Sequence, residues 1–594
     1  MTCQGFHRIA RDALRTRSAF RRAVLALVAF CPIGVPVSAV AQANDLQQIV
    51  DNFAGSAVSD GTVIGAAVAV LLPGQEPKFY AYGLADAAAA APPTAKTIFQ
   101  IGSVTKVFTT NLLGQAAAAN PSLLNASLGE YQAQLGALPG AGPQVTLQQL
   151  GSFTAGYPTY PPICSGPETP QQTGCRPSGR PTITEYDASD FTTFFRSYAP
   201  QDQLTPPTIT APPFPYSYSD FSTGLIGLLL GSTPNAPLEN AALSGWETLL
   251  RQRLLQPLSM RETSLTPPSS RAPLLAQGYQ QALATAVVDD AGAITGFNIV
   301  SNGGAYETAP SVQITGGGGQ GATALATVSK GKVTAVCPAN PAVTACASSS
   351  GQGYLAPAQV AFAGGNPTTP AHAVAVIQGG SVVAIRLGSD GSGYQTAPTI
   401  TISGGQLSGG EPAQATAHLV HGQVVTIDVT NGGTQYVDPL AVLVDPGAAS
   451  SNPVPIWAPA GALKSSARDM ASFAAAALLR SRVAGHSIPQ AIHDGFAIAE
   501  TPYACRGTDP DLANCTGAES ALAWDVLPSN QHGPLYVTKD GGLPGFSSYI
   551  GLLPDQDLAV VVLVNSRQDD PTITQPAVAI GLDILWASFV SLSQ

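Results

Sequence analysis

The chain has 594 residues, of which 61 are glycine and 50 are proline, and only 11% are charged. This length exceeds one ordinary hydrophobic core, so two or more domains are expected. The formal net charge is −11, and an acidic protein with few lysines is not expected to bind nucleic acid or anionic membranes.

Residues 1–43 have the pattern of a secretory signal peptide. Six arginines precede the apolar run 23–30, and small-residue cleavage sites end at Ala41 and Ala43. A membrane anchor is the alternative, but Pro32 interrupts the run well short of a spanning helix. We therefore expect a periplasmic or secreted protein with no stable membrane span after cleavage.

The six cysteines that follow form three close pairs in loop-like sequence, which are Cys164 with Cys175, Cys337 with Cys346, and Cys505 with Cys515. In an exported chain, three local disulfides are the simplest interpretation. Zinc binding is the alternative, but no second pair or histidine cluster accompanies any of them. The sequence thus predicts disulfides and no metal.

Helical and strand patterns alternate in the first half of the chain. In order, they predict a helix at 45–53, strands at 63–72 and 78–83, a helix from Ser103, a helix start at 145–150, and helices near 191–198, 223–230 and 246–255. The proline-rich segment 161–215 is expected to be a surface excursion around the helix near 191–198.

The composition changes at about residue 284, where alternating apolar strands and glycine clusters begin. A motif of glycines, one tyrosine and a proline occurs four times, centred on Tyr306, Tyr354, Tyr394 and Tyr436. Repeats of this length predict one β unit per copy, stacked so that neighbours bury each other's apolar faces. We assign residues 283–452 to an inserted β-repeat domain, either a spacer or a binder of cell-surface glycan.

The final part returns to mixed structure. Its patterns predict a helix at 470–479, an antiparallel series of strands at 521–526, 535–539, 546–553 and 558–564, and a closing helix at 577–590.

Two Ser-x-x-Lys patterns occur in the chain. Ser103 and Lys106 lie in predicted helix, where residues three apart share a face and an amine can accept a hydroxyl proton. Ser329 and Lys332 lie in a turn-like segment where no helix is expected. Only the first pattern is therefore a candidate nucleophile site.

Two further motifs complete a constellation. Tyr218-Ser219-Asp220 stands where a loop enters a helix, and Lys539-Asp540-Gly541-Gly542 is expected at the end of a strand. Together with Ser103 and Lys106 they resemble the serine β-lactamase and penicillin-binding protein family, with its Ser-x-x-Lys, Tyr-x-Asn and Lys-Thr-Gly motifs. The similarity is greatest to the class C β-lactamase and D-alanyl-D-alanine carboxypeptidase/esterase branch.

The resemblance implies an α+β fold of the β-lactamase/transpeptidase type. An antiparallel sheet flanked by helices and an all-helical subdomain would be built from residues 44–282 and 453–594, interrupted by the β-repeat insertion. The implied activity is that of a serine hydrolase without a cofactor. Its substrate would be a β-lactam, a D-alanyl-D-alanine peptide or an ester. The alternative from another class is a catalytically idle protein that binds cell wall or glycan through its repeats.

The family's roles fall on particular residues. Ser103 would form the acyl-enzyme, Lys106 would hold or receive its proton, and Tyr218 would act as base, acidified by the two nearby ammonium groups. The amides of Ser103 and Gly542 would form the oxyanion hole. The residues expected to bind substrate are Asp220, Lys539, Asp540 and Gly541. Each residue also has an alternative without a catalytic role: Ser103 could cap a helix, Tyr218 could be a packed aromatic, and Lys539 could be a solvated strand residue.

Two positions depart from the family pattern. Asp220 replaces its asparagine and Asp540 its threonine. A carboxylate only accepts hydrogen bonds when ionised, whereas an amide both donates and accepts. We hypothesise that Asp220 pairs with Lys106 and weakens recognition of the amide side chains of β-lactams.

Overall fold

The computed structural model describes residues 39–160, 187–200, 211–340, 345–449, 454–483, 485–531, 533–567 and 574–593. Most of the expected signal peptide lies outside these residues. Cys164 and Cys175 also lie outside them, so their disulfide stays a prediction. The chain consists of two compact units, up to Gln48 and from Ile49 onward, with helix α2 (Ala39–Val50) at their junction.

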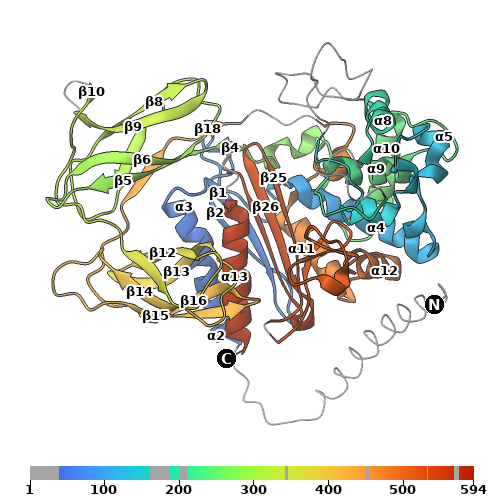
Figure 1. Ribbon diagram of the computed structural model, residues 1–594. Coiled ribbons are helices and arrows are strands. Elements are labelled where there is room, and N and C mark those ends of the chain that lie inside the picture. The colour runs from blue at the N-terminus through green and yellow to red at the C-terminus, as the bar shows by residue number, and fades with distance from the viewer. Residues whose placement is uncertain are drawn as a thin grey trace, which may run out of the picture. The chain divides into compact units, whose positions relative to one another are not determined.

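An eight-stranded antiparallel sheet joins the two ends of this unit (Figure 1). Its order is β2 (Lys78–Gly83), β1 (Gly65–Leu71), β27 (Leu558–Val564), β26 (Phe546–Leu553), β25 (Tyr536–Leu543), β24 (Asp525–Leu527), β23 (Glu519–Ser520) and β22 (Ala504–Cys505). Val68 stands opposite Val562, so strands almost 500 residues apart in sequence are direct neighbours. The antiparallel sheet is as predicted.

The central strands are apolar on both faces because helices cover both. Alternate residues of β27, such as Val561 and Leu563, belong to the large core that includes α11 (Ala467–Ala477). The opposite face of the sheet packs against α13 (Pro576–Ser593), where a β-carbon on Gly581 would overlap the ring of Tyr549. Helix α13 is long and apolar enough to span a membrane, but half of it is buried inside the protein, as expected of a core helix.

The helical subdomain supplies the rest of this core (Figure 1). Its main helices are α4 (Thr105–Ala119), α6 (Leu147–Gly151), α8 (Ala188–Ser197), α9 (Asp220–Gly231), α10 (Ala241–Leu250) and α12 (Gln490–Ala499). Buried phenylalanines join separate helices, as where Phe191 stacks on Phe221 with centroids 4.7 Å apart.

Two predicted elements differ in detail. The helix predicted at 246–255 begins earlier, as α10, and ends in the π-helical turn Arg251–Leu255. The strand predicted at 521–526 is wrong in its first part, because the amide of Ala521 donates to the carbonyl of Trp524 and Ala523 has φ +63°. This turn separates β23 from β24, which is short.

The described residues between 282 and 448 form strands and turns without a helix, in two modules. In the first are β5 (Ala282–Val288), β6 (Ile294–Asn302), β7 (Val312–Thr315), β8 (Ala324–Ser329), β9 (Lys332–Asn340) and β17 (Ala441–Val444). In the second are β11 (Gln359–Ala363), β12 (His372–Gln378), β13 (Ser381–Ser389), β14 (Thr399–Ser403), β15 (Gln414–Val420) and β16 (Gln423–Asn431). The second forms one sheet in the order β13-β12-β11-β14-β15-β16, and its outer strands meet where Val382 donates to Gly432, so the barrel is nearly closed.

The four repeat tyrosines have the same structural role. Each is at most 7% exposed. Each hydroxyl accepts a backbone N–H, as from Ala282 to Tyr306 at 2.9 Å and from Ala371 to Tyr394 at 2.9 Å. Each tyrosine amide also donates to a hairpin glycine, and Tyr394 and Tyr436 bind Gly422 and Gly380 respectively. The sequence repeat is therefore a repeat of tyrosines that fasten one hairpin to another.

The second module contacts helices that pack on the main sheet. Arg386 on β13 forms a 2.5 Å ion pair with Asp60, and the amide of Leu387 donates to the Asp583 carboxylate on α13 at 3.2 Å. These contacts hold the barrel against α13 and against the residue that follows α3 (Ser56–Ser59).

Candidate active site

Ser103 lies in a tight turn that precedes helix α4. The turn Gly102–Val104 is 3-10 helical, and Gly102 has φ +50°, a conformation that favours glycine. A β-carbon on Gly102 would also lie 2.6 Å from the amide nitrogen of Gly542. Glycine therefore lets the Ser103 turn approach the backbone of β25 closely.

Lys106 lies one helical turn after Ser103 and is fully buried. Its ammonium donates to Ser103 Oγ at 3.0 Å and to the carbonyl of Ala460 at 2.8 Å, and it forms an ion pair with Asp220. An ammonium has three N–H donors and no acceptor. The three partners match a protonated lysine, which can orient the serine hydroxyl.

Tyr218 comes to the same place from the loop before α9. Ser219 caps that helix by accepting the amide of Ser222 at 3.0 Å, which fixes the loop. The ammonium groups of Lys106 and Lys539 lie 4.8 Å and 4.9 Å from the centroid of the tyrosine ring. The structure thus brings the three predicted motifs together around one phenol.

The predicted acidification of Tyr218 is wrong for this structure. Burial raises the pKa of Tyr218 most, and although Lys106 lowers it, the Asp220 carboxylate raises it again, so the net shift is upward. The prediction counted two ammonium groups but neither the loss of solvent nor the carboxylate that offsets Lys106. The pKa of Tyr218 is therefore raised above that of a free phenol rather than lowered.

Lys539 lies inside β25 rather than at its end, which corrects its predicted position. It is 3% exposed, and its ammonium lies 3.5 Å from Asp540 Oδ1. Burial lowers the pKa of Lys539, but the carboxylates of Asp540 and Asp525 raise it, with an upward net result. Lys539 is thus a cation already partly compensated by carboxylates.

A second group of charges beside Lys539 was not anticipated from sequence. Arg506 forms a 3.0 Å ion pair with Asp525 and lies 4.9 Å from the centre of the Tyr216 ring. No sequence motif marks Arg506 or Asp525, which fall in a cysteine loop and a short strand. The one feature that could have drawn attention to them is that they are charged, in a chain where only 11% of the residues are.

The end of β25 lies against the Ser103 turn. A β-carbon on Gly541 would lie 2.1 Å from the carbonyl oxygen of Ile101 and 2.9 Å from the Ser103 amide nitrogen, and one on Gly542 would lie 2.8 Å from the guanidinium of Arg567. The predicted amide pair, Ser103 and Gly542, thus belongs to two backbone segments in close contact. Such a pair can donate two hydrogen bonds to one oxyanion.

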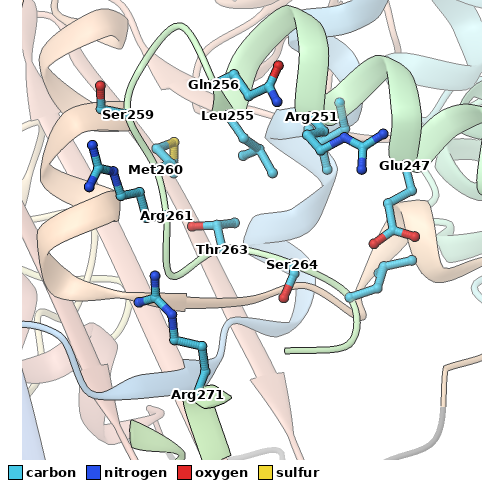
Figure 2. Close-up of a pocket in the computed structure, with 12 residues that line it drawn as sticks. Glu247, Arg251, Leu255, Gln256, Ser259, Met260, Arg261, Thr263, Ser264 and Arg271 are labelled. Atoms are coloured by element: carbon cyan, nitrogen blue, oxygen red, sulfur yellow. The ribbon is translucent and has the colours of Figure 1, made fainter. Parts of the chain in front are cut away.

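Two cavities of the protein are lined by neither Ser103, Lys106 nor Tyr218. One, of about 420 Å³, is lined by residues that follow one another along α10 and the loop after it, with Arg251, Arg261 and Arg271 among its charged side chains (Figure 2). Thr263, one of its lining residues, donates through Oγ1 to the buried Asp469 carboxylate at 2.8 Å. Among the described residues, no group of three histidine, cysteine or acidic side chains is placed to hold a metal ion.

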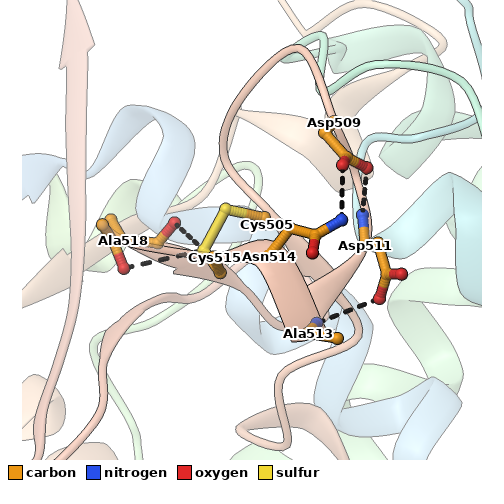
Figure 3. Close-up of a disulfide and its surroundings, with 8 residues drawn as sticks. Cys505, Asp509, Asp511, Ala513, Asn514, Cys515 and Ala518 are labelled. Atoms are coloured by element: carbon orange, nitrogen blue, oxygen red, sulfur yellow. Dashed lines mark hydrogen bonds between the residues drawn. A yellow bond between two sulfur atoms is a disulfide. The ribbon is translucent and has the colours of Figure 1, made fainter.

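Two of the three predicted disulfides are present in the structure, Cys337–Cys346 and Cys505–Cys515. The third predicted pair, Cys164 and Cys175, is not among them, because both cysteines lie outside the described residues. The Cys505–Cys515 bond closes a loop beside the site, after edge strand β22 (Figure 3). The Cys337–Cys346 bond joins β9 to β10 (Ala345–Cys346) in the inserted region.

Comparisons with known proteins agree with these motifs. A sequence model of the beta-lactamase family matches residues 45–336 and 405–582, which hold all three motifs. A beta-lactamase of Pseudomonas fluorescens is 29% identical over 241 residues, which cover 40% of this chain and 56% of that protein. A beta-lactamase of Escherichia coli K12 is 26% identical over 250 residues, 42% of this chain and 56% of that protein. The chain thus matches little more than half the length of these relatives.

Two solved structures align with this chain at low identity. A class C beta-lactamase has a TM-score of 0.48 and 13% identity, covering 91% of this chain and 96% of that structure. A beta-lactamase/D-alanine carboxypeptidase from Pseudomonas syringae has a TM-score of 0.48 and 14% identity, covering 92% and 98%.

Proposed function

Because the chain belongs to the beta-lactamase family, we propose that it is a serine hydrolase that forms an acyl-enzyme on Ser103. One observation carries the proposal. The Lys106 ammonium donates to Ser103 Oγ at 3.0 Å, while the ammonium groups of Lys106 and Lys539 lie 4.8 Å and 4.9 Å from the centroid of the Tyr218 ring. A serine oriented by a lysine and next to a phenol is a suitable arrangement for nucleophilic attack on a carbonyl.

The proposed reaction begins with attack of Ser103 Oγ on the substrate carbonyl. The serine proton passes to the Tyr218 oxygen in its deprotonated form, and Lys106 holds the serine oxygen in place by its hydrogen bond. The amides of Ser103 and Gly542 donate to the oxyanion that forms. Tyr218 then protonates the leaving group, and a water molecule releases the acyl group from Ser103.

The carboxylates at the site affect which acyl substrate it can bind. Asp220 pairs with Lys106 and Asp540 lies 3.5 Å from Lys539, so both lysines are partly neutralised. A substrate that needs a free ammonium for its carboxylate, or an amide partner for its side chain, loses those contacts. Among a β-lactam, a D-alanyl-D-alanine peptide and an ester, we therefore propose that the ester is the best substrate.

The proposal is tested by acylation. The protein is incubated with a penicillin and, separately, with an activated acyl ester, and its intact mass is measured. We expect an adduct that Ser103→Ala abolishes. The matched control is Ser329→Ala, because Ser329 belongs to the second Ser-x-x-Lys pattern, which forms the β8–β9 hairpin turn. Folded protein that gives no adduct with either reagent would show that the proposal is wrong.

We also propose that the protein is exported to the periplasm or secreted. The support is its N-terminal sequence pattern together with two disulfides, which persist in oxidising compartments. Cell fractionation, followed by mass analysis of the mature N-terminus, tests this. Cleavage after Ala41 or Ala43 is expected, and uncleaved protein in the cytoplasm would contradict it.

A further inference from the structure

The loop closed by Cys505–Cys515 is an ordered element. Its internal hydrogen bonds include Asn514 Nδ2 to Asp509 at 2.8 Å and the amides of Asp511 and Ala513 to neighbouring carboxylates at 3.0 and 2.9 Å (Figure 3). The disulfide joins Cys505 to Cys515, which are ten residues apart in sequence, and so closes the loop. The backbone at Cys505 and at its neighbour Arg506 is therefore held in place.

From this fixed point the loop reaches the segment that carries Tyr218. The carbonyl of Gly507 accepts the Tyr216 amide at 3.2 Å, and the Arg506 guanidinium lies over the Tyr216 ring at 4.9 Å. Tyr216 precedes Tyr218 by two residues, and both rings pack against Phe153. A shift of the loop would therefore move the backbone that positions the phenol.

The same arginine also reaches the strand that carries Lys539. Arg506 Nη1 lies 3.0 Å from Asp525, which stands on β24 opposite Thr538, the residue before Lys539. Asp525 also raises the pKa of Lys539, so the carboxylate that Arg506 holds acts on the Lys539 ammonium as well. Arg506 therefore joins the loop to the strand pair that carries Lys539.

We propose that the Cys505–Cys515 loop aligns the candidate active site, with Arg506 as the positioning residue that holds Tyr218 and Lys539 in register. This rests on the proposed serine hydrolase function. Arg506 contacts Tyr216 and Asp525 rather than any reacting atom, so it acts through them. The disulfide is part of the device because Cys505 is adjacent to Arg506 and fixes its backbone.

Arg506→Met, which keeps length and loses charge, tests the arginine. With the activated ester, kcat is expected to fall about 10-fold to 100-fold, as for a displacement of about 1 Å at the reacting groups. KM and Tm are expected to stay near those of the wild type, and Arg506→Lys is expected to recover much of the loss because it keeps the charge beside Asp525. An Arg506→Met variant with the kcat of the wild type would overturn the proposal. So would an equal loss of kcat in Arg506→Met and Arg506→Lys accompanied by a much lower Tm.

The disulfide has a matched control within the chain. Cys337–Cys346 spans nine residues, against ten for Cys505–Cys515, so loop closure stabilises the protein similarly in both. Replacing both cysteines by serine is expected to lower kcat for the pair Cys505 and Cys515 and leave it unchanged for the pair Cys337 and Cys346. Equal effects would contradict the inference while acylation of Ser103 still supports the function. No acylation of the wild type contradicts both.

Discussion

Asp220 forms an ion pair with the fully buried ammonium of Lys106 at the position where the family pattern has asparagine. The same ammonium donates to Ser103 and to the carbonyl of Ala460, so its three hydrogen atoms are all engaged. A neutral amide in place of Asp220 would leave the buried charge uncompensated. Asp220 is thus the charge partner of Lys106, and its carboxylate also raises the pKa of Tyr218.

Asp220→Asn is expected to change substrate preference. An amide can donate to the carbonyl of a β-lactam side chain, and one such hydrogen bond contributes about 1 kcal/mol, or roughly fivefold in kcat/KM. The ratio of kcat/KM for a chromogenic cephalosporin to that for a simple ester should therefore rise. Because a buried ammonium loses its partner, unfolding free energy should fall by roughly 3 kcal/mol at neutral pH. An unchanged ratio would contradict the role assigned to Asp220.

Tyr218→Phe is expected to slow acylation of Ser103 by about 10²-fold to 10⁴-fold, the usual contribution of a general base. Tyr216→Phe is the matched control, because its ring faces Arg506 and not Lys106.

The same base predicts the pH dependence of acylation. Tyr218 accepts a proton only in its deprotonated form, and burial raises its pKa, so this form is a small fraction that grows with pH. In the wild type, the acylation rate should therefore rise about tenfold for each unit of pH in the neutral range. Stopped-flow measurement of adduct formation gives both results, and a flat pH profile would exclude Tyr218.

Gly541→Ala is expected to disable the site through the backbone. Its β-carbon would lie 2.1 Å from the carbonyl oxygen of Ile101, a main-chain atom that cannot rotate away. We expect a stability loss of about 1–3 kcal/mol and a kcat loss on the order of 10²-fold from the displaced Ser103 amide.

Gly296→Ala provides the control for Gly541→Ala. Gly296 also lies within a strand, β6, but a β-carbon there meets nothing within 4 Å. Its substitution should leave kcat and Tm near those of the wild type. Equal kcat for Gly541→Ala and the wild type would show that the contact between β25 and the Ser103 turn is not needed.

The parts of this site that sequence could predict are those fixed by local spacing. Ser103 and Lys106 are one helical turn apart, and Tyr218 precedes a recognisable helix start. The antiparallel strands near the C-terminus likewise follow from their apolar runs. Each of these features depends on residues close in sequence, where periodicity and capping determine the conformation.

What sequence could not predict depends on long-range neighbours. The pKa of Tyr218 is set by burial among segments distant in sequence. Arg506 reaches Asp525 only because β22 and β24 belong to the same sheet. The 521–526 strand prediction failed because a turn at Ala523 interrupts an apolar run without any glycine or proline to mark it. Charge balance and short strands at a sheet edge are properties of the assembled fold.

Asp390 makes stability depend on pH where the inserted barrel meets the main sheet. Burial raises the pKa of Asp390 to about 6, and the charge of Asp390 adds to the burial that raises the pKa of Asp583 on α13. Since the folded state binds more protons than the unfolded state between about pH 4 and 6, unfolding free energy should fall as pH rises through this window.

Asp390→Asn removes the part of this dependence that Asp390 contributes, because an amide does not titrate, while the buried Asp583 still titrates. The variant should be more stable than the wild type above about pH 6, by about 1–3 kcal/mol, and should lose this advantage near pH 4. Chemical denaturation at several pH values measures the difference. Asp290→Asn, at an exposed hairpin position of the same insertion, is the control and should follow the wild type. If Asp390→Asn instead keeps the pH dependence of the wild type, Asp390 ionises in the folded barrel as freely as in the unfolded chain.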